Sequence, residues 1–232
     1  MENPGFARHA YAEEIQALGH DLLDMASRAE SMVGLAVEAL VRLDKAKAME
    51  VIHRDDEIDE ADIAIESRCL RLLALQQPIA GDFRLIGTAL RMIVDIERIG
   101  DLAVDIAKIS MKIEAEFGKT SVIDVPRIAG VARSMLRVAI EAFVKHDLGL
   151  VQRVIEQDDE VDALYRDLRG QLHANMRANP DLVVADSWLL LAIHHVERIA
   201  DHAVNIAERV AFMVTGRLEQ LSILHQSAEP HG

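Results

Sequence analysis

The chain has 232 residues; half of them are hydrophobic, only 3% are aromatic, and the formal net charge is −14. This excess of carboxylates disfavours binding of nucleic acid through phosphate neutralisation, and also docking on an anionic membrane surface. No segment is long and apolar enough to span a bilayer, and the first residues lack the pattern of a signal peptide, so we expect a cytoplasmic protein.

Apolar residues recur at three- and four-residue spacing, which predicts six helices. In chain order these helices cover residues 8–43, 45–76, 79–115, 125–146, 148–178 and 181–215. Asp44 and Asp147 are expected to cap the helices that follow them. Gly118 and Gly216 are expected to end the third and sixth helices in the left-handed conformation that glycine adopts most easily.

The sequence contains an internal repeat. Residues 97–107 return at 197–207 with eight of eleven positions identical. A second match, at an offset of 103, aligns residues 31–40 with 134–143. The two halves are therefore expected to share one fold.

Short loops between long helices favour antiparallel neighbours. We therefore predict an elongated all-α protein of two tandem three-helix bundles related by the repeat. The first bundle is expected over residues 8–117, the second over 125–216, and a partly frayed C-terminal extension over 217–232. Residues 117–125 form the predicted linker.

Paired carboxylates in the first half obey the symmetry of a helical hairpin. Asp55 and Asp59 lie on its second predicted helix, and Glu97 and Asp101 lie on its third. Positions that face each other across an antiparallel pair are equidistant from the turn. Pro78 is the midpoint of 55 and 101, and also of 59 and 97, so the four carboxylates are expected to meet.

The second half repeats this arrangement although its hairpin is three residues shorter. Asp158 with Asp201, and Asp162 with Glu197, both centre immediately before Pro180. Two unrelated acidic motifs would have no reason to keep this registry. We therefore expect a second group of four facing carboxylates.

Four adjacent carboxylates in partly apolar surroundings need a cation, protons or arginines to balance their charge. Oxygen ligands favour hard divalent or trivalent ions such as Mg, Mn or Fe, and bridging carboxylates would allow a multinuclear site. The alternative is a structural ion-pair network with Arg98 and Arg198, which directly follow the glutamates. Weaker candidate ligands are Asp62, Asp105 and His194.

Catalytic motifs are not found. The sequence has no nucleophile–base pair, no phosphate-binding Gly-rich loop after a strand, and no Glu-x-x-His pair at matching repeat positions, as a di-iron bundle would require. We therefore do not expect an enzyme.

Longer motifs resemble a known family. Residues 77–84, Gln-Pro-Ile-Ala-Gly-Asp-Phe-Arg, leading to Asp-Ile-Glu-Arg-Ile-Gly-Asp at 95–101, resemble the signature of the PhoU family of phosphate-specific transport accessory proteins. Residues 197–208 resemble its second copy, and the likeness covers nearly the whole chain.

This resemblance implies a negative regulator of the phosphate-starvation response that couples the phosphate ABC transporter to the sensor histidine kinase of the phosphate regulon. The implied partners are that kinase, the transporter's ATP-binding subunit and a second copy of the chain in a homodimer. An alternative is an accessory protein of another phosphate or ion transporter without a kinase partner. Family members carry acidic motifs that bind metal clusters in some structures, and the resemblance implies that the matching residues here are Asp55, Asp59, Glu97, Asp101, Asp158, Asp162, Glu197 and Asp201.

Overall fold

The computed structural model describes residues 4–76 and 80–217, and within these ranges it contains six α-helices, one short 3-10 helix and no strand. The elements are α1 (Pro4–Arg42), α2 (Lys45–Gln76), α3 (Ala80–Glu116), α4 (Val125–Lys145), α5 (Leu148–Ala178), η1 (Pro180–Leu182) and α6 (Val183–Thr215). The six predicted helices are confirmed with small shifts at their ends. The predicted turn at Pro78 and the C-terminal extension from residue 218 lie outside the described residues.

Local sequence signals set several helix ends as predicted. Asp44 accepts hydrogen bonds from two backbone N–H groups in the first turn of α2. Asp147 accepts one from the first turn of α5. Gly118 and Gly216 have φ values of 65° and 71°, a left-handed conformation in which any other residue would be strained.

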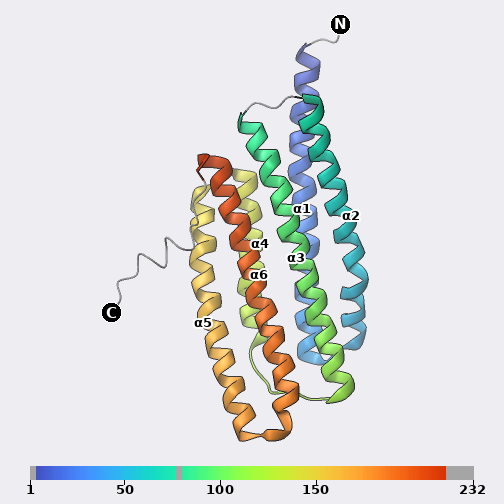
Figure 1. Cartoon of the computed structure of the whole chain (residues 1–232), viewed down its shortest axis with the longest axis vertical. Coiled ribbons are helices and arrows are strands. Elements are labelled where there is room, and N and C mark those ends of the chain that lie inside the picture. Colours follow the sequence, from blue (N-terminus) through green and yellow to red (C-terminus); the bar gives the residue numbers. More distant parts are fainter. Residues whose placement is uncertain (1–3, 77–79, 218–232) are drawn as a thin grey trace, which may run out of the picture.

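The helices form two elongated three-helix bundles, α1–α3 and α4–α6, that lie side by side (Figure 1). The order across the view is α5, α6, α3 and α2, with α4 and α1 behind them. This confirms the predicted all-α architecture. None of the described helices is long and apolar enough to cross a membrane.

The two bundles meet along α3 and α6, which run antiparallel. Arg84 of α3 donates to the carbonyl of Met213 in α6, and Thr88 donates to the carbonyl of Arg209. Contact between α3 and α6 is as extensive as contact between α3 and either of the other two helices of its own bundle. One hydrophobic core therefore runs through both halves, and the division into two domains at residues 117–125 stays a prediction.

A pseudo-two-fold axis relates the halves. Residues before Ile99 on α3 meet residues at nearly the same distance after Ile199 on α6. Asp95, four residues before Ile99, meets His202, three residues after Ile199, and Thr88, eleven before, meets Arg209, ten after. Ile99 and Ile199 are both fully buried. The repeat thus predicts that the two halves have similar structures. The antiparallel packing of α3 and α6 relates these halves by a two-fold rotation.

Asp186 of α6 holds the linker between the bundles. Its carboxylate is fully buried and accepts hydrogen bonds from the Thr120 hydroxyl at 2.9 Å, the Ser121 backbone N–H at 2.8 Å and the Ser121 hydroxyl at 2.5 Å. The equivalent position in the first half is Ile86, a core residue. Equivalent positions of the repeat therefore differ in role: Ile86 packs in the core of the first half, and Asp186 holds the linker in the second.

Candidate functional site

The first acidic cluster, defined as Asp55, Asp59, Glu97 and Asp101, lies between α2 and α3. Burial raises the pKa of Asp55, and the nearby charges of Asp59 and Asp101 raise it further. Burial likewise raises the pKa of Glu97, with contributions from Asp101 on its own helix and from Asp59 on α2. The hairpin therefore brings the four predicted carboxylates into mutual electrostatic range.

Close helix packing supports this cluster at Gly100. A β carbon at that position would lie 3.7 Å from Oδ1 of Asp55 and 3.5 Å from Cγ2 of Ile58. The backbone of α3 thus approaches α2 at the level where the carboxylates face each other.

The second acidic cluster, defined as Asp158, Asp162, Glu197 and Asp201, lies between α5 and α6. Burial raises the pKa of Asp158 to about 7, and Asp162, Asp201 and Glu197 add to the rise. Burial also raises the pKa of Asp201 to about 6, with a further rise from Glu197 that nearby His202 partly offsets. Asp201 remains open to solvent on one side, so its shielding comes from the neighbouring helices.

An arginine approaches the first cluster and a histidine approaches the second. In the first, Arg98 donates to Asp101 at 2.8 Å and lies 3.5 Å from Glu97, as the ion-pair alternative predicts. In the second, Nδ1 of His194 lies 3.0 Å from Oε2 of Glu197, although the angle is not that of a hydrogen bond. The ion-pair network is thus present in the first cluster through Arg98.

Two carboxylate oxygens at these sites are buried without a hydrogen-bond donor: Oδ1 of Asp62 and Oε2 of Glu197. Such oxygens require a proton, a water molecule or a cation. All-carboxylate donors also suit hard cations chemically. In the described part of the chain, however, no three acidic, histidine or cysteine side chains already converge on one point that could hold a metal ion. The donor set fits a cation, and the side chains would have to rotate inward to bind it.

The weaker candidates take different positions. Asp62 borders the first cluster, and burial, Glu66 and Asp59 raise its pKa. Asp105 lies 3.9 Å from Nζ of Lys108 and acts electrostatically on His195 of α6, across the interface between the halves.

The α3–α6 interface contains a polar group that sequence reasoning missed. Oδ1 of Asp95 accepts from Nδ2 of Asn205 at 3.3 Å and lies 2.9 Å from Nδ1 of His202. The repeat indicates that the halves are alike, but it carries no signal for which helix faces pack together.

Comparisons with known proteins agree on one family for both halves of the chain. The sequence profile of the PhoU domain matches residues 22–110 and again residues 125–210. The "phosphate-specific transport system accessory protein PhoU homolog" of Clostridium acetobutylicum is 32% identical over 93% of this chain and 99% of its own length. Its homologue from Pseudomonas aeruginosa is 33% identical over 88% of this chain and 84% of its own length.

Solved structures of similar proteins also match the fold of this chain. The crystal structure of PhoU from Pseudomonas aeruginosa superposes with a TM-score of 0.84 at 32% identity, covering 89% of this chain and 100% of that one. The phosphate transport system regulatory protein PhoU from Streptococcus pneumoniae gives a TM-score of 0.83 at 27% identity, covering 90% of this chain and 99% of that one.

Proposed function

The chain belongs to the PhoU family, and from that membership we propose that it is a cytoplasmic accessory protein of phosphate transport that represses the phosphate-starvation response. It does so by coupling the phosphate ABC transporter to the sensor histidine kinase of the phosphate regulon. The observation that carries this proposal is the match of the family domain to both halves of the chain. The role is one of binding partners rather than of catalysis.

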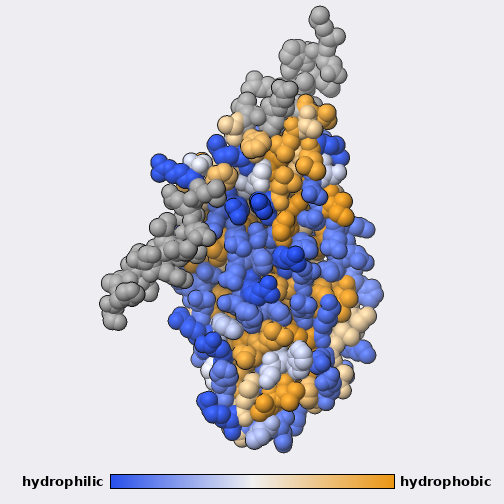
Figure 2. Space-filling view, in the orientation of Figure 1, coloured by the Kyte–Doolittle hydropathy of each residue, from blue (hydrophilic) through white to orange (hydrophobic). Residues whose placement is uncertain are grey.

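The two bundles differ on their outer faces, which supports binding of two different partners. Ile63 and Leu70 of α2 are 66% and 53% exposed. The equivalent positions of α5 carry Arg166 and His173. Figure 2 shows hydrophobic side chains gathered over the upper part of the first bundle. The first bundle is therefore suited to a partner with an apolar surface, and the second to a partner with a polar surface. The kinase and the ATP-binding subunit could thus bind to different bundles.

Each acidic cluster is proposed to bind one or more hard cations, with Mg, Mn and Fe as candidates. The raised pKa values of Asp158 and Asp201, and the buried Oε2 of Glu197, which accepts no hydrogen bond, support this role in the second cluster. The unpaired oxygen of Asp62 supports it in the first. A cation held there would join α2 to α3, and α5 to α6, and would stabilise the folded chain by binding it selectively.

Affinity capture from phosphate-replete cells tests the regulatory proposal. The tagged chain should retain the ATP-binding subunit and the sensor kinase, and deletion of its gene should raise expression of phosphate-responsive genes when phosphate is plentiful. Light scattering on the purified chain should give the mass of a homodimer. Recovery of neither partner would contradict the proposal, and recovery of the transporter subunit alone would favour an accessory role without a kinase.

A matched surface variant sharpens this test. Ile63→Arg with Leu70→His gives the first bundle the side chains of the second, at positions that do not contribute to the core. We expect this variant to lose one partner and to keep the other. Loss of both partners with an unchanged melting temperature would show that one surface binds them both.

A further inference from the structure

Four arginines, Arg91 and Arg98 of α3 and Arg198 and Arg209 of α6, lie along the interface between the bundles. We call this set the arginine seam. On α3, Arg91 and Arg98 are four residues before and three residues after Asp95, so all three share one helix face. On α6, Arg198 and Arg209 flank His202 and Asn205 at the same kind of spacing.

Contacts of Asp95 fix the register of these two stripes. Its Oδ1 lies 2.9 Å from Nδ1 of His202 and accepts from Nδ2 of Asn205, so the middle of each stripe meets the middle of the other. Because the helices are antiparallel, Arg91 lies on the same side of this contact as Arg209. The bond from the Thr88 hydroxyl to the carbonyl of Arg209, at 3.4 Å, confirms that register.

The same register places Arg98 and Arg198 at a similar level along the two helices, on the opposite side of Asp95. The seam thus consists of two arginine pairs. Along α3 they are separated by seven residues, or about 10 Å at 1.5 Å per residue.

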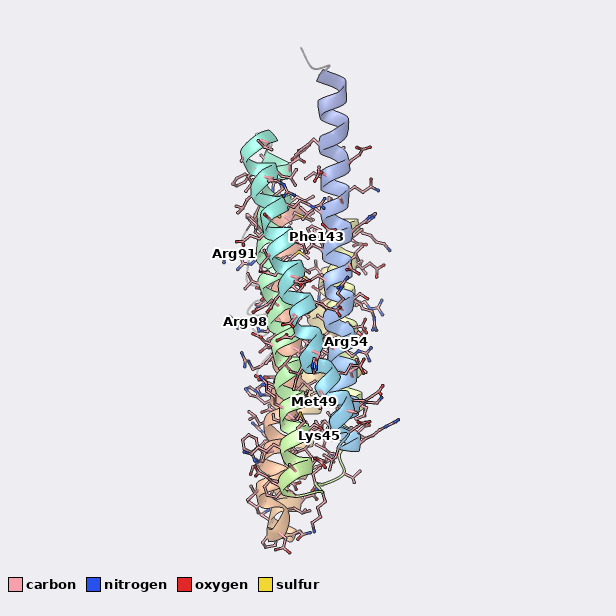
Figure 3. The ribbon with its side chains drawn as sticks, turned by 90° about the vertical axis from the view of Figure 1, so that its right-hand side faces the viewer. Lys45, Met49, Arg54, Arg91, Arg98 and Phe143 are labelled. Atoms are coloured by element: carbon pink, nitrogen blue, oxygen red, sulfur yellow. The ribbon has the colours of Figure 1, made fainter. Side chains whose placement is uncertain are left out.

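The seam faces outward. Arg91, Arg98 and Arg198 are exposed, and Arg209 is half-buried. Figure 3 places the labelled Arg91 and Arg98 on the edge of α3 that points away from α1. Strongly hydrophilic side chains gather in the middle of this face (Figure 2).

Charge balance favours an anion at the Arg91–Arg209 pair, because Arg98 of the other pair already contacts Asp101 and Glu97. Asp95, the carboxylate between the pairs, is already engaged by His202 and Asn205. Arg209 bonds Thr88 through its backbone carbonyl, which leaves its guanidinium out of that contact. Two guanidinium groups carry two positive charges, so a doubly charged phosphoryl group matches a pair, whereas a carboxylate brings one charge. Guanidinium also binds phosphoryl oxygens with two parallel hydrogen bonds.

We propose that the arginine seam is a binding site for phosphoryl dianions, with Arg91 and Arg209 as its main pair. The site accepts inorganic phosphate or a phosphomonoester group. It is independent of cation binding in the acidic clusters, because Arg91 and Arg209 lie on the far side of Asp95 from the contact of Arg98 with Glu97 and Asp101.

Calorimetric titration of the full chain with inorganic phosphate, at low ionic strength and with EDTA present, tests the proposal. EDTA removes cations from the acidic clusters, so failure of the proposed metal sites cannot affect the outcome. We expect saturable binding, and binding weaker by about tenfold or more in Arg91→Gln with Arg209→Gln, because charge-assisted hydrogen bonds are lost. The control Arg153→Gln with Arg177→Gln removes the same charge from exposed positions of α5 and should bind as the parent does.

Vesicle flotation identifies the source of the phosphoryl group. Vesicles containing phosphatidate present phosphomonoesters, and vesicles of phosphatidylcholine alone do not. Binding to phosphatidate that the Arg91–Arg209 variant loses and the control keeps would support a lipid source, even without measurable binding of free phosphate. Absence of binding to both probes, or an equal loss in the seam variant and the control, would overturn the proposal.

Discussion

The two acidic clusters occupy equivalent positions on two similar hairpins, yet their surroundings treat the carboxylates differently. In the first cluster Arg98 pairs with Asp101 and Glu97. In the second, burial is the leading cause that raises the pKa of Asp158 to about 7 and that of Asp201 to about 6. Hairpin registry thus determines which carboxylates meet, and the neighbouring side chains determine how many of them stay ionised without a cation.

Neighbours on α2 and α5 account for part of this difference. The first cluster is extended by Asp62 and Glu66, where the second half has Tyr165 and Arg169. The ring of Tyr165 lies 6.0 Å from that of His194, and Arg169 lies 5.6 Å from the Tyr165 ring. Larger side chains therefore neighbour the second cluster, whereas the first has more acidic neighbours.

The largest expected effect comes from the position where the halves carry Ile86 and Asp186. Asp186→Ala should lower the free energy of unfolding by about 3 kcal/mol, because three hydrogen bonds from the linker lose their buried acceptor. Urea denaturation measures this change. Ser187→Ala, one residue away on the exposed side, is the control, and an equal loss there would contradict the anchoring role of Asp186.

Cation binding should divide between the clusters. Mg²⁺ or Mn²⁺ at about 100 times its dissociation constant should stabilise the protein by about 2.7 kcal/mol per site. Asp158→Asn with Asp201→Asn should remove the contribution of the second cluster, and Asp55→Asn with Asp101→Asn that of the first. Thermal shift and metal content by mass spectrometry measure both effects.

Matched controls for the cation experiment are available one position away. Asp56→Asn and Asp159→Asn each remove one carboxylate charge from an exposed position beside one of the clusters. They should leave metal content unchanged. Metal content that stays the same in all four variants would show that the acidic clusters are ion-pair networks.

The pH dependence of the cation-free protein should differ between the halves. The pKa of Asp158 is raised from 3.8 to about 7 on folding, so the folded chain holds this proton more tightly than the unfolded chain. Stability from this group is therefore lost as pH rises through that window. Asp158→Asn should flatten the curve by about 1–2 kcal/mol, after allowance for solvent screening.

The equivalent variant in the first half should change the curve less. Burial also raises the pKa of Asp55, but Asp55 is less deeply buried than Asp158. Thermal melts in EDTA measure the stability of both variants. They are recorded from about pH 5 to 8, where a carboxyl group with a raised pKa loses its proton. Rising stability across that range for the parent protein would contradict the assigned direction.

The smallest expected effect concerns the close approach of the hairpin helices. Gly100→Ala should stabilise the protein by about 0.5–1 kcal/mol, because alanine favours the helix and its β carbon would make ordinary contacts. Ala200→Gly should destabilise the second half by a similar amount. Urea denaturation measures the free energy of unfolding of both variants. A destabilised Gly100→Ala variant would mean that α2 and α3 cannot accept the added carbon.

Most of the fold could be predicted from local signals. Helix periodicity, the caps at Asp44 and Asp147, and the glycines at 118 and 216 act within a few residues of the chain. The facing of the acidic residues could also be predicted, because distance from a turn sets registry in a hairpin. Asp55 and Asp101, for instance, influence one another as their spacing indicates.

Contacts between the halves could not be predicted in this way. Asp95 and His202 are 107 residues apart, and no turn connects their helices directly. The anchoring role of Asp186 was missed for the same reason, since its partners are on the linker. A weak signal was present in α3 and α6, whose apolar residues exceed what one bundle face requires. Helices that are apolar on several faces pack against several neighbours.

The pseudo-two-fold axis between α3 and α6 has an evolutionary consequence. In an isologous interface, each residue meets its partner twice, with roles exchanged. Asp95 meets Asn205, and their repeat equivalents, His195 and Asp105, interact on the other side of the axis. An ancestral chain of half the length would have paired with itself through this surface. Gene duplication and fusion then released the two copies from identity, so that one could place an acid where the other placed a histidine.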